Sequence, residues 1–218
     1  MRYLFSSYNY DLTDPGSIPN LFVQHLYLVG LSMLISLVIA LPLGVIVARY
    51  RRLYLPIVGF SGLLYTIPGI ALIAELIPLT KLTLATAIIP LVLYAQLVLI
   101  RNTVTAIRAV DPLLLEVGRS MGMTPGQVLR RVTLPIALPI IVAGVRIATV
   151  TSVGIASLAS LVGQGGLGDL IFKNITTGDT DAIVAGAILM AVLAVVADVL
   201  LLGVQNALNR GRTAVSVA

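Results

Sequence analysis

The 218-residue sequence has no cysteine, no tryptophan and a single histidine. Without cysteine the chain has no disulfide, no thiolate metal site and no cysteine nucleophile, and one histidine cannot supply a histidine-rich metal site. Charge is scarce as well, because Asp, Glu, Lys and Arg make up 11% of the residues, against about 25% in soluble domains. These shortages exclude the sites named and argue against a soluble globular fold.

Apolar residues take the place of the missing charge, at 58% of the chain, and the mean hydropathy is +1.05. Such values are typical of a membrane protein. The formal net charge of +5 would suggest nucleic-acid binding in a soluble chain. Here, however, the basic residues gather in short segments between apolar runs, which is the pattern of membrane topology. We therefore expect an all-α integral protein of the lipid membrane that does not bind nucleic acid.

Five segments are apolar and long enough, or nearly so, to cross the hydrocarbon core, which takes about 20 helical residues. They are Leu26–Ala48, Leu55–Leu79, Leu84–Ile100, Ile136–Val162 and Ala182–Val204. The first lies far from the N-terminus and has no basic flank before it, so we expect a retained span and not a signal peptide. No repeat or second domain is apparent, and the sequence predicts a single transmembrane domain over 1–218.

Lysine and arginine are unevenly distributed between the two sides of this topology. One side has ten of them: Arg49, Arg51, Arg52, Arg101, Arg108, Arg119, Arg130, Arg131, Arg210 and Arg212. The other side has three: Arg2, Lys81 and Lys173. Because cytoplasmic loops carry the excess of basic residues, we predict that the N-terminus is outside and that the C-terminus and the segment 111–135 are cytoplasmic.

The segment 111–135 contains signals for two short helices joined by a tight turn. Asp111 followed by Pro112 is a favourable helix start, and Gly122 marks the end, since glycine accepts the left-handed conformation of a C-cap. The sequence TPGQ at 124–127 then starts a second helix with a capping box. The first helix is amphipathic, and its apolar residues would pack on the ends of the bundle: Leu113, Leu114 and Val117. On periodicity alone it could also be a helix at the membrane surface.

Spacing within this segment is more specific than periodicity. Residues 116–135 read EVGRSMGMTPGQVLRRVTLP. The pattern consists of Glu116 with the two residues after it, then Gly122, the aliphatic residue Val132, and the pair Leu134-Pro135. This order resembles the cytoplasmic EAA loop of binding-protein-dependent ABC importer permeases, although Val117 stands where alanine is usual. In that family the loop forms a coupling helix that docks in a groove of a separate ATPase subunit. The resemblance implies that six residues form or shape this contact: Glu116, Gly118, Arg119, Gly122, Met123 and Thr124.

Four further stretches resemble the permeases for glycine betaine, carnitine and choline. They are LLYTIPGIAL (63–72), IRNTVTAIRAVDP (100–112), VAGVRIATVTSVGIASLASLVGQGGLGDLI (142–171) and DAIVAGAI (181–188). The methionine importer permeases share the EAA-type loop and a GGLGD-like loop, and they are the main alternative within the class.

The resemblance implies a permease subunit of an ATP-driven importer in the cytoplasmic (inner) membrane of a prokaryote, with the five-helix fold of methionine-permease-like subunits. The implied partners are an ABC ATPase dimer, a second permease copy or paralogue, and an external substrate-binding protein. Because the sequence has no phosphate-binding P-loop and no nucleophile motif, we expect no enzymatic activity and no cofactor on this chain. ATP would be used by the partner ATPase.

Two pairs of residues are candidates for a translocation path or gate. Arg146 and Asp198 lie inside predicted spans, where charge is costly unless it is paired or faces water, so they form either a structural ion pair or a gate. Gly165 and Gly166 belong to GQGGLGD (163–169), which lacks the G-K-[ST] ending of a phosphate loop. We expect this run to form a flexible or tightly turned external loop that closes the outer mouth.

Functions of another class stay open at the level of sequence. Arg146 and Asp198 would be the catalytic candidates of an intramembrane enzyme, and a nucleotide-independent carrier or channel is a further alternative. His25 is expected at the membrane interface without a role, and Glu75 is expected to be solvated. The chain has no evident aromatic cage for a quaternary ammonium group, so specificity would rest largely with the binding protein.

Overall fold

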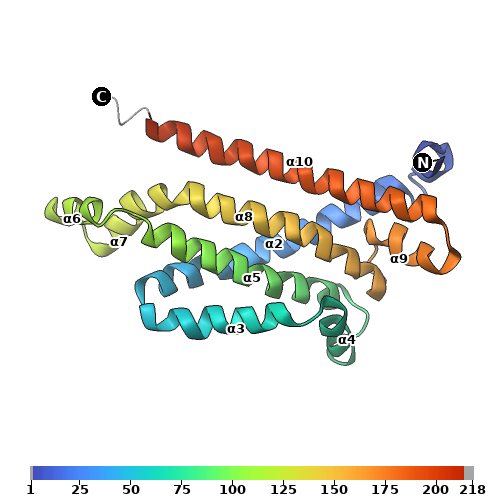
Figure 1. The fold of residues 1–218 in the computed structure, drawn as a ribbon, viewed down its shortest axis with the longest axis horizontal. Coiled ribbons are helices and arrows are strands. Elements are labelled where there is room, and N and C mark those ends of the chain that lie inside the picture. Colours follow the sequence, from blue (N-terminus) through green and yellow to red (C-terminus); the bar gives the residue numbers. More distant parts are fainter. Residues whose placement is uncertain (1, 214–218) are drawn as a thin grey trace.

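The computed structural model describes residues 2–213, and every regular element in this range is helical (Figure 1). Four helical segments are long and apolar enough to cross a membrane: α2 (Ile18–Arg49), α5 (Leu84–Arg108), the run Pro125–Val162 that includes α8 (Leu134–Ala156), and α10 (Thr180–Thr213). A bent pair, α3 (Tyr54–Thr66) and α4 (Gly69–Thr80), is the fifth candidate. The expected all-α architecture is confirmed, with four or five candidate spans.

Shorter elements connect these segments. They are α1 (Arg2–Phe5), the 3₁₀ turns Ser7–Tyr10, Arg51–Leu53 and Ser157–Val162, α6 (Pro112–Ser120), α7 (Pro125–Val128), the π turn Leu129–Thr133, and α9 (Gly168–Thr177). The outermost residues of the predicted domain, 1 and 214–218, lie outside the described part, as do the side chains of Arg2, Arg210 and Arg212.

The helices α2, α5 and α10 extend beyond the spans expected from hydropathy, and α2 and α5 do so for visible reasons. α2 begins at Ile18, and Pro19 in its first turn is favourable at a helix start, although the Ser17 side chain makes no capping hydrogen bond. α5 continues to Arg108, whose guanidinium donates a hydrogen bond to the Val47 carbonyl oxygen at 3.0 Å. The polar end of α5 is thereby tied to the end of α2, so apolarity alone underestimates the length of both helices.

The second predicted span is not one straight helix, because α3 and α4 meet at 96°. Pro68 disfavours the helical conformation of the residue before it, and Ile67 is accordingly extended, with ψ 127°. The Ile67 carbonyl oxygen that the break releases accepts a hydrogen bond from the Tyr94 hydroxyl at 2.7 Å. This contact fixes the bend against α5.

The centre of the bundle is formed by α2, α5 and α8, and α10 lies along α8 (Figure 1). Close approach of these helices depends on small residues. A Cβ atom on Gly44 would lie 2.6 Å from Thr103 of α5, and one on Gly144 would lie 2.5 Å from the Asn102 Cβ atom. Neither position therefore accepts a larger residue without a shift of the helices.

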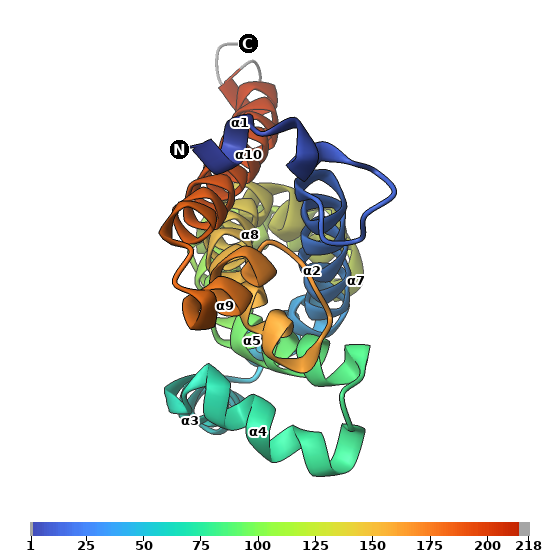
Figure 2. The ribbon, with the colours of Figure 1, turned by 90° about the vertical axis from the view of Figure 1, so that its right-hand side faces the viewer.

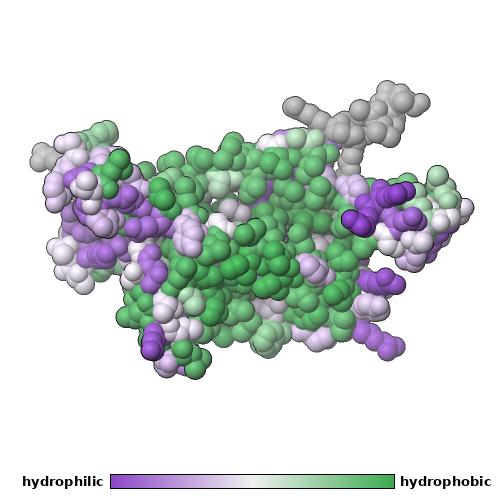
Figure 3. Space-filling view, turned by 180° about the vertical axis from the view of Figure 1, so that it is seen from behind, coloured by the Kyte–Doolittle hydropathy of each residue, from purple (hydrophilic) through white to green (hydrophobic). Residues whose placement is uncertain are grey.

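The face of the molecule seen in Figure 3 divides into an apolar middle and two polar ends. One end carries α6 and α7, which we call the α6–α7 end. The opposite end, seen face-on in Figure 2, carries the N-terminal segment and α9, and we call it the α9 end. The outward face of α10 is apolar and largely uncovered. The long helices run between the two polar ends, which is the arrangement that a membrane-crossing bundle requires.

Candidate functional site

The turn between α6 and α7 has the geometry expected at Gly122. This residue has φ +81°, in the left-handed region that favours glycine. Its N–H donates to the Arg119 carbonyl oxygen at 2.9 Å, and the Met123 N–H donates to that of Gly118 at 3.2 Å. These two bonds form a Schellman motif, which satisfies the last carbonyl groups of α6. The helix end predicted from Gly122 is confirmed.

Both predicted helix starts are present as well. The Asp111 side chain accepts a hydrogen bond from the Leu113 N–H at 2.9 Å. At the start of α7, the Thr124 hydroxyl accepts from the Gln127 N–H, and the Gln127 side chain accepts from the Thr124 N–H at 2.8 Å, which is a complete capping box. α7 continues through the π turn into α8, so the α6–α7 element is joined directly to a candidate span.

The six predicted contact residues do not all lie on one surface. Glu116, Arg119, Gly122 and Thr124 are exposed, whereas Gly118 is buried and Met123 is half-buried. A Cβ atom on Gly118 would lie 3.5 Å from the Val128 side chain and 3.6 Å from the Met123 sulfur. Gly118 and Met123 thus pack inside the turn and determine its shape, whereas the other four residues are accessible to a partner protein.

The expected packing of Leu113, Leu114 and Val117 of α6 on the bundle is wrong. All three residues are exposed, and so is Met121, at 72%. The reason is that α6 also packs on α7 and the π turn, and its contact with the apolar cluster of α5 and α8 is made by Leu115 instead. The result is an exposed surface that mixes apolar side chains with Glu116 and Arg119. Exposed apolar side chains that gather in this way are typical of a docking surface.

Arg146 and Asp198 form an ion pair between α8 and α10. The Arg146 Nε atom donates to Asp198 Oδ1 at 2.9 Å and Nη2 donates to Oδ2 at 2.8 Å, while Nη1 donates to the Gln205 side chain at 2.8 Å. This bidentate geometry is the strongest arrangement available to the two groups. Because both carboxylate oxygens accept from the guanidinium, Asp198 is poorly placed to act as a general base, which disfavours the intramembrane-enzyme alternative.

The glycine-rich run forms a tight turn at the α9 end. Gly163, Gly165 and Gly166 have φ of +71°, +70° and +83°. A Cβ atom on Gly165 would lie 1.9 Å from Oε1 of Gln24, and that same oxygen accepts a hydrogen bond from the Gly166 N–H at 3.0 Å. Of the two expected forms, the structure shows the tightly turned one, seated on α2.

His25 is buried inside the bundle, so the expected position of an exposed interfacial side chain is wrong. Its exposed fraction is 0%, its Nε2 atom lies 3.0 Å from the Val153 carbonyl oxygen, and its Nδ1 atom accepts from the Leu167 N–H at 3.2 Å. The two hydrogen bonds compensate for burial of the imidazole. Its spacing from Leu28 and Ser32 at positions i, i+3 and i+7 of the buried face of α2 is the signal that could have placed it inside.

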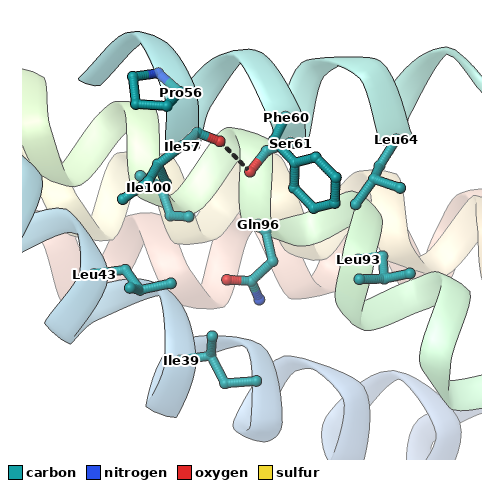
Figure 4. A pocket seen from close by; sticks show the side chains of 10 residues that line it. All are labelled: Ile39, Leu43, Pro56, Ile57, Phe60, Ser61, Leu64, Leu93, Gln96 and Ile100. Atoms are coloured by element: carbon teal, nitrogen blue, oxygen red, sulfur yellow. Dashed lines mark hydrogen bonds between the residues drawn. The ribbon is translucent and has the colours of Figure 1, made fainter. Parts of the chain in front are cut away.

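A cavity of about 390 Å³ between α2, α3 and α5 contains a residue that sequence did not single out (Figure 4). The walls are almost entirely apolar, and Gln96 of α5 projects between Ile39 of α2 and Phe60 of α3. The Gln96 amide donates to the Val92 and Ser36 carbonyl oxygens at 3.2 and 3.4 Å, but its Oε1 atom has no hydrogen-bond partner among the described residues. A buried amide oxygen without a partner, on a residue that lines an apolar cavity, makes Gln96 a candidate element of the path.

Comparison with known proteins shows the family. A profile described as "Binding-protein-dependent transport system inner membrane component" matches residues 40–213. The osmoprotectant import permease protein OsmW of Salmonella typhimurium is 40% identical over 92% of this chain and 96% of its own length. The glycine betaine/carnitine/choline transport system permease protein OpuCD of Bacillus subtilis is 41% identical over 92% and 88%.

Among solved structures, an inward-facing conformation of the MetNI methionine ABC transporter superposes with a TM-score of 0.76 and 28% identity, over 85% of this chain and 93% of that one. The relatives carry the names of the osmoprotectant branch, and the solved structure is a transporter of the methionine branch. The resemblance inferred from the segment 116–135 is therefore confirmed, and the chain belongs to the family of binding-protein-dependent transport system inner membrane components.

Proposed function

We propose that this chain is the transmembrane permease subunit of an ATP-driven importer for quaternary-amine osmoprotectants such as glycine betaine, carnitine or choline. The observation that carries the proposal is the α6–α7 element, whose exposed surface combines Glu116 and Arg119 with apolar side chains on a turn fixed at Gly122. The substrate class is supported by the names of relatives about 40% identical over most of the chain. Methionine or another amino acid is the second candidate, supported by the fold similarity to MetNI.

In this proposal the α6–α7 end is cytoplasmic and the α9 end is external, following the excess of basic residues. An ATPase dimer contacts the α6–α7 element, a second permease completes the membrane path, and an external binding protein delivers the substrate. ATP is hydrolysed by the partner, so this chain is a translocation subunit and not an enzyme. It would reside in the inner membrane of a prokaryote.

The connection of α6–α7 to the bundle suggests how ATP is coupled to transport. α7 passes through the π turn into α8, and α8 ends beside the glycine turn at the opposite end. A displacement of α6–α7 on closure of the ATPase dimer would therefore move a helix that reaches the α9 end. Rigid-body movement of packed helices of this kind can switch a path between inward and outward opening.

Reconstitution tests this function. We expect proteoliposomes that contain this permease and its ATPase, with the binding protein present, to take up labelled glycine betaine or choline. Uptake should occur only when ATP is present on the side of the membrane where the ATPase lies. Excess unlabelled betaine should compete and excess methionine should not. Competition by methionine alone would support the amino-acid alternative, and uptake into vesicles that contain this chain without an ATPase would support a nucleotide-independent carrier.

Valine at Gly165 or Gly166 is expected to reduce import by roughly tenfold or more, because a side chain there combines a strained backbone with a collision against α2. Association with the ATPase should persist, since the turn lies at the other end of the bundle. Uptake and co-purification measure the two effects.

Gly178→Val is the matched control for this pair. Gly178 also has a positive φ, of +73°, but an added Cβ atom would meet nothing within 4 Å. If import by the Gly165 and Gly178 variants falls equally, the contact with α2 is not what matters. Unchanged import in all three variants would contradict a role for the turn in closing the outer mouth.

A further inference from the structure

His25 joins three segments of the chain at the α9 end. It lies in α2, its Nε2 atom contacts α8 at Val153, and its Nδ1 atom contacts the segment 163–167 at Leu167. We call this residue with its two hydrogen bonds the His25 latch. We propose that His25 is a positioning residue for transport, and that the latch stabilises the state in which the α9 end is closed. This inference rests on the proposed function and adds to it a role for His25 in stabilising one conformational state of the transporter.

The contact with Val153 forms where α8 changes its geometry. At the end of α8 the chain tightens into the 3₁₀ turn, and the Ser157 N–H donates to the carbonyl oxygens of Gly154 and Ile155 instead of that of Val153. The Val153 carbonyl oxygen thus loses its usual helical donor inside the bundle. A buried carbonyl group needs a partner, and the imidazole N–H of His25 supplies it.

The contact with Leu167 is one of two neighbouring bonds that hold the glycine turn. Gly166 donates its N–H to the Gln24 side chain, and Leu167 donates its N–H to His25, so consecutive amides bind consecutive residues of α2. A Cβ atom on Gly166 would lie 3.0 Å from the His25 Nδ1 atom. The turn therefore lies so close to α2 that only glycine fits at positions 165 and 166. Figure 2 shows the segment before α9 passing beside α2.

These partners require one form of the imidazole. Nδ1 accepts from an N–H group, so the proton must be on Nε2, which then donates to the Val153 carbonyl oxygen. Nonpolar packing could not replace these contacts, because each hydrogen bond satisfies a specific buried backbone group, the Val153 carbonyl oxygen or the Leu167 N–H. Leucine in place of His25 would leave both the Val153 carbonyl group and the Leu167 N–H without a partner.

The place of the latch indicates which state it favours. It lies at the end opposite the α6–α7 element, and it connects α8, which continues from that element, to α2. The solved structure that superposes on this chain is inward-facing, a state in which the outer end must be closed. Release of the latch should shift the population toward outward opening about three- to tenfold, which is the size expected for loss of one or two buried hydrogen bonds.

The test uses the complete transporter with His25→Leu. We expect its ATPase activity without binding protein to rise about three- to tenfold, and the substrate imported per ATP to fall. His25→Gln can still donate toward Val153 and His25→Asn can still accept from Leu167, so both should lie between His25→Leu and the wild type. A purely structural role would lower the amount of assembled transporter but would not raise this basal ATPase activity.

A second measurement follows the closed end directly. Because the chain has no cysteine, Val162→Cys introduces the only thiol of this chain, at a position that is 1% exposed and next to the glycine turn. A maleimide that cannot cross the membrane should label this thiol slowly in the wild-type background and several-fold faster with His25→Leu. Ser32→Ala is the matched control, because Ser32 is buried on the same face of α2 and its hydroxyl bonds only within its own helix, to Val29.

The outcomes separate the two proposals. If assembled His25→Leu transporter shows wild-type basal ATPase activity and wild-type labelling of Val162→Cys, the latch proposal is overturned. The same holds if Ser32→Ala produces equal changes, or if none of the three His25 variants assembles, since His25 would then be required for folding alone. Wild-type complex that neither couples to an ATPase nor imports substrate would instead overturn the proposed function.

Discussion

Gly122→Val is expected to reduce ATP-driven import on the order of a hundredfold while the protein remains in the membrane. At φ +81° a β-branched residue is strained, and an added Cβ atom meets nothing within 4 Å, so the cost is conformational and local. Relief of that strain would break the Schellman motif and change the direction of Glu116 and Arg119. Uptake into vesicles and co-purification of the ATPase should both fall.

Gly126→Val controls for the volume of the new side chain, because Gly126 is also exposed in the same element and also has open space, but it has no positive φ. Its effect should be small by comparison. Charge reversal by Glu116→Lys should weaken ATPase association without affecting the turn. If Gly122→Val and Glu116→Lys both keep wild-type association and import, α6 is a membrane-surface helix and the coupling proposal fails.

Neutralising one member of the Arg146–Asp198 pair should lower the amount of protein in the membrane by roughly tenfold. Arg146→Met leaves an unpaired carboxylate between α8 and α10, and Asp198→Leu leaves an unpaired guanidinium. The double variant removes both charges and should recover most of the accumulation. Membrane content and thermal unfolding in detergent measure the effect.

The same variants distinguish a structural pair from a gate. Double neutralisation that restores both accumulation and import identifies a structural ion pair. Restored accumulation without import identifies a gate or path element. The charge-swapped variant Arg146→Asp with Asp198→Arg should also accumulate better than either single neutralisation, and its failure to do so would contradict direct pairing.

Local signals in the sequence were sufficient wherever one residue type dictates a backbone conformation. Gly122 identifies a helix end because few other residues adopt its φ, and the capping box at Thr124 depends only on residues close in sequence. The bend at Pro68 is equally local, yet hydropathy averaged over a window conceals it. The family resemblance of 116–135 was predictable for the same reason, since it depends on spacing within one segment.

Contacts between distant segments were not predictable in this way. Arg146 and Asp198 could be paired from the sequence because both lie at a similar depth within their predicted spans. The third partner, Gln205, could not, since polar residues near a helix end usually face water. His25 was misplaced because its position near the start of a span suggests the interface, whereas both of its partners lie more than a hundred residues further along the chain. Gln96 carries no local signal at all, and only the cavity beside it makes it a candidate.

The π turn Leu129–Thr133 determines how α6 and α7 are rotated about the helix axis relative to α8. It accommodates a wider backbone ring than the α-helices on either side, and the Thr133 hydroxyl bonds back to the Val128 carbonyl oxygen five residues earlier. One residue corresponds to about 100° of rotation around an α-helix. The extra residue in this turn therefore sets the direction in which Glu116 and Arg119 point relative to the side chains of α8, Arg146 among them. A single deletion here should therefore rotate α6 and α7 relative to α8 and turn the surface that we propose as the ATPase contact in another direction.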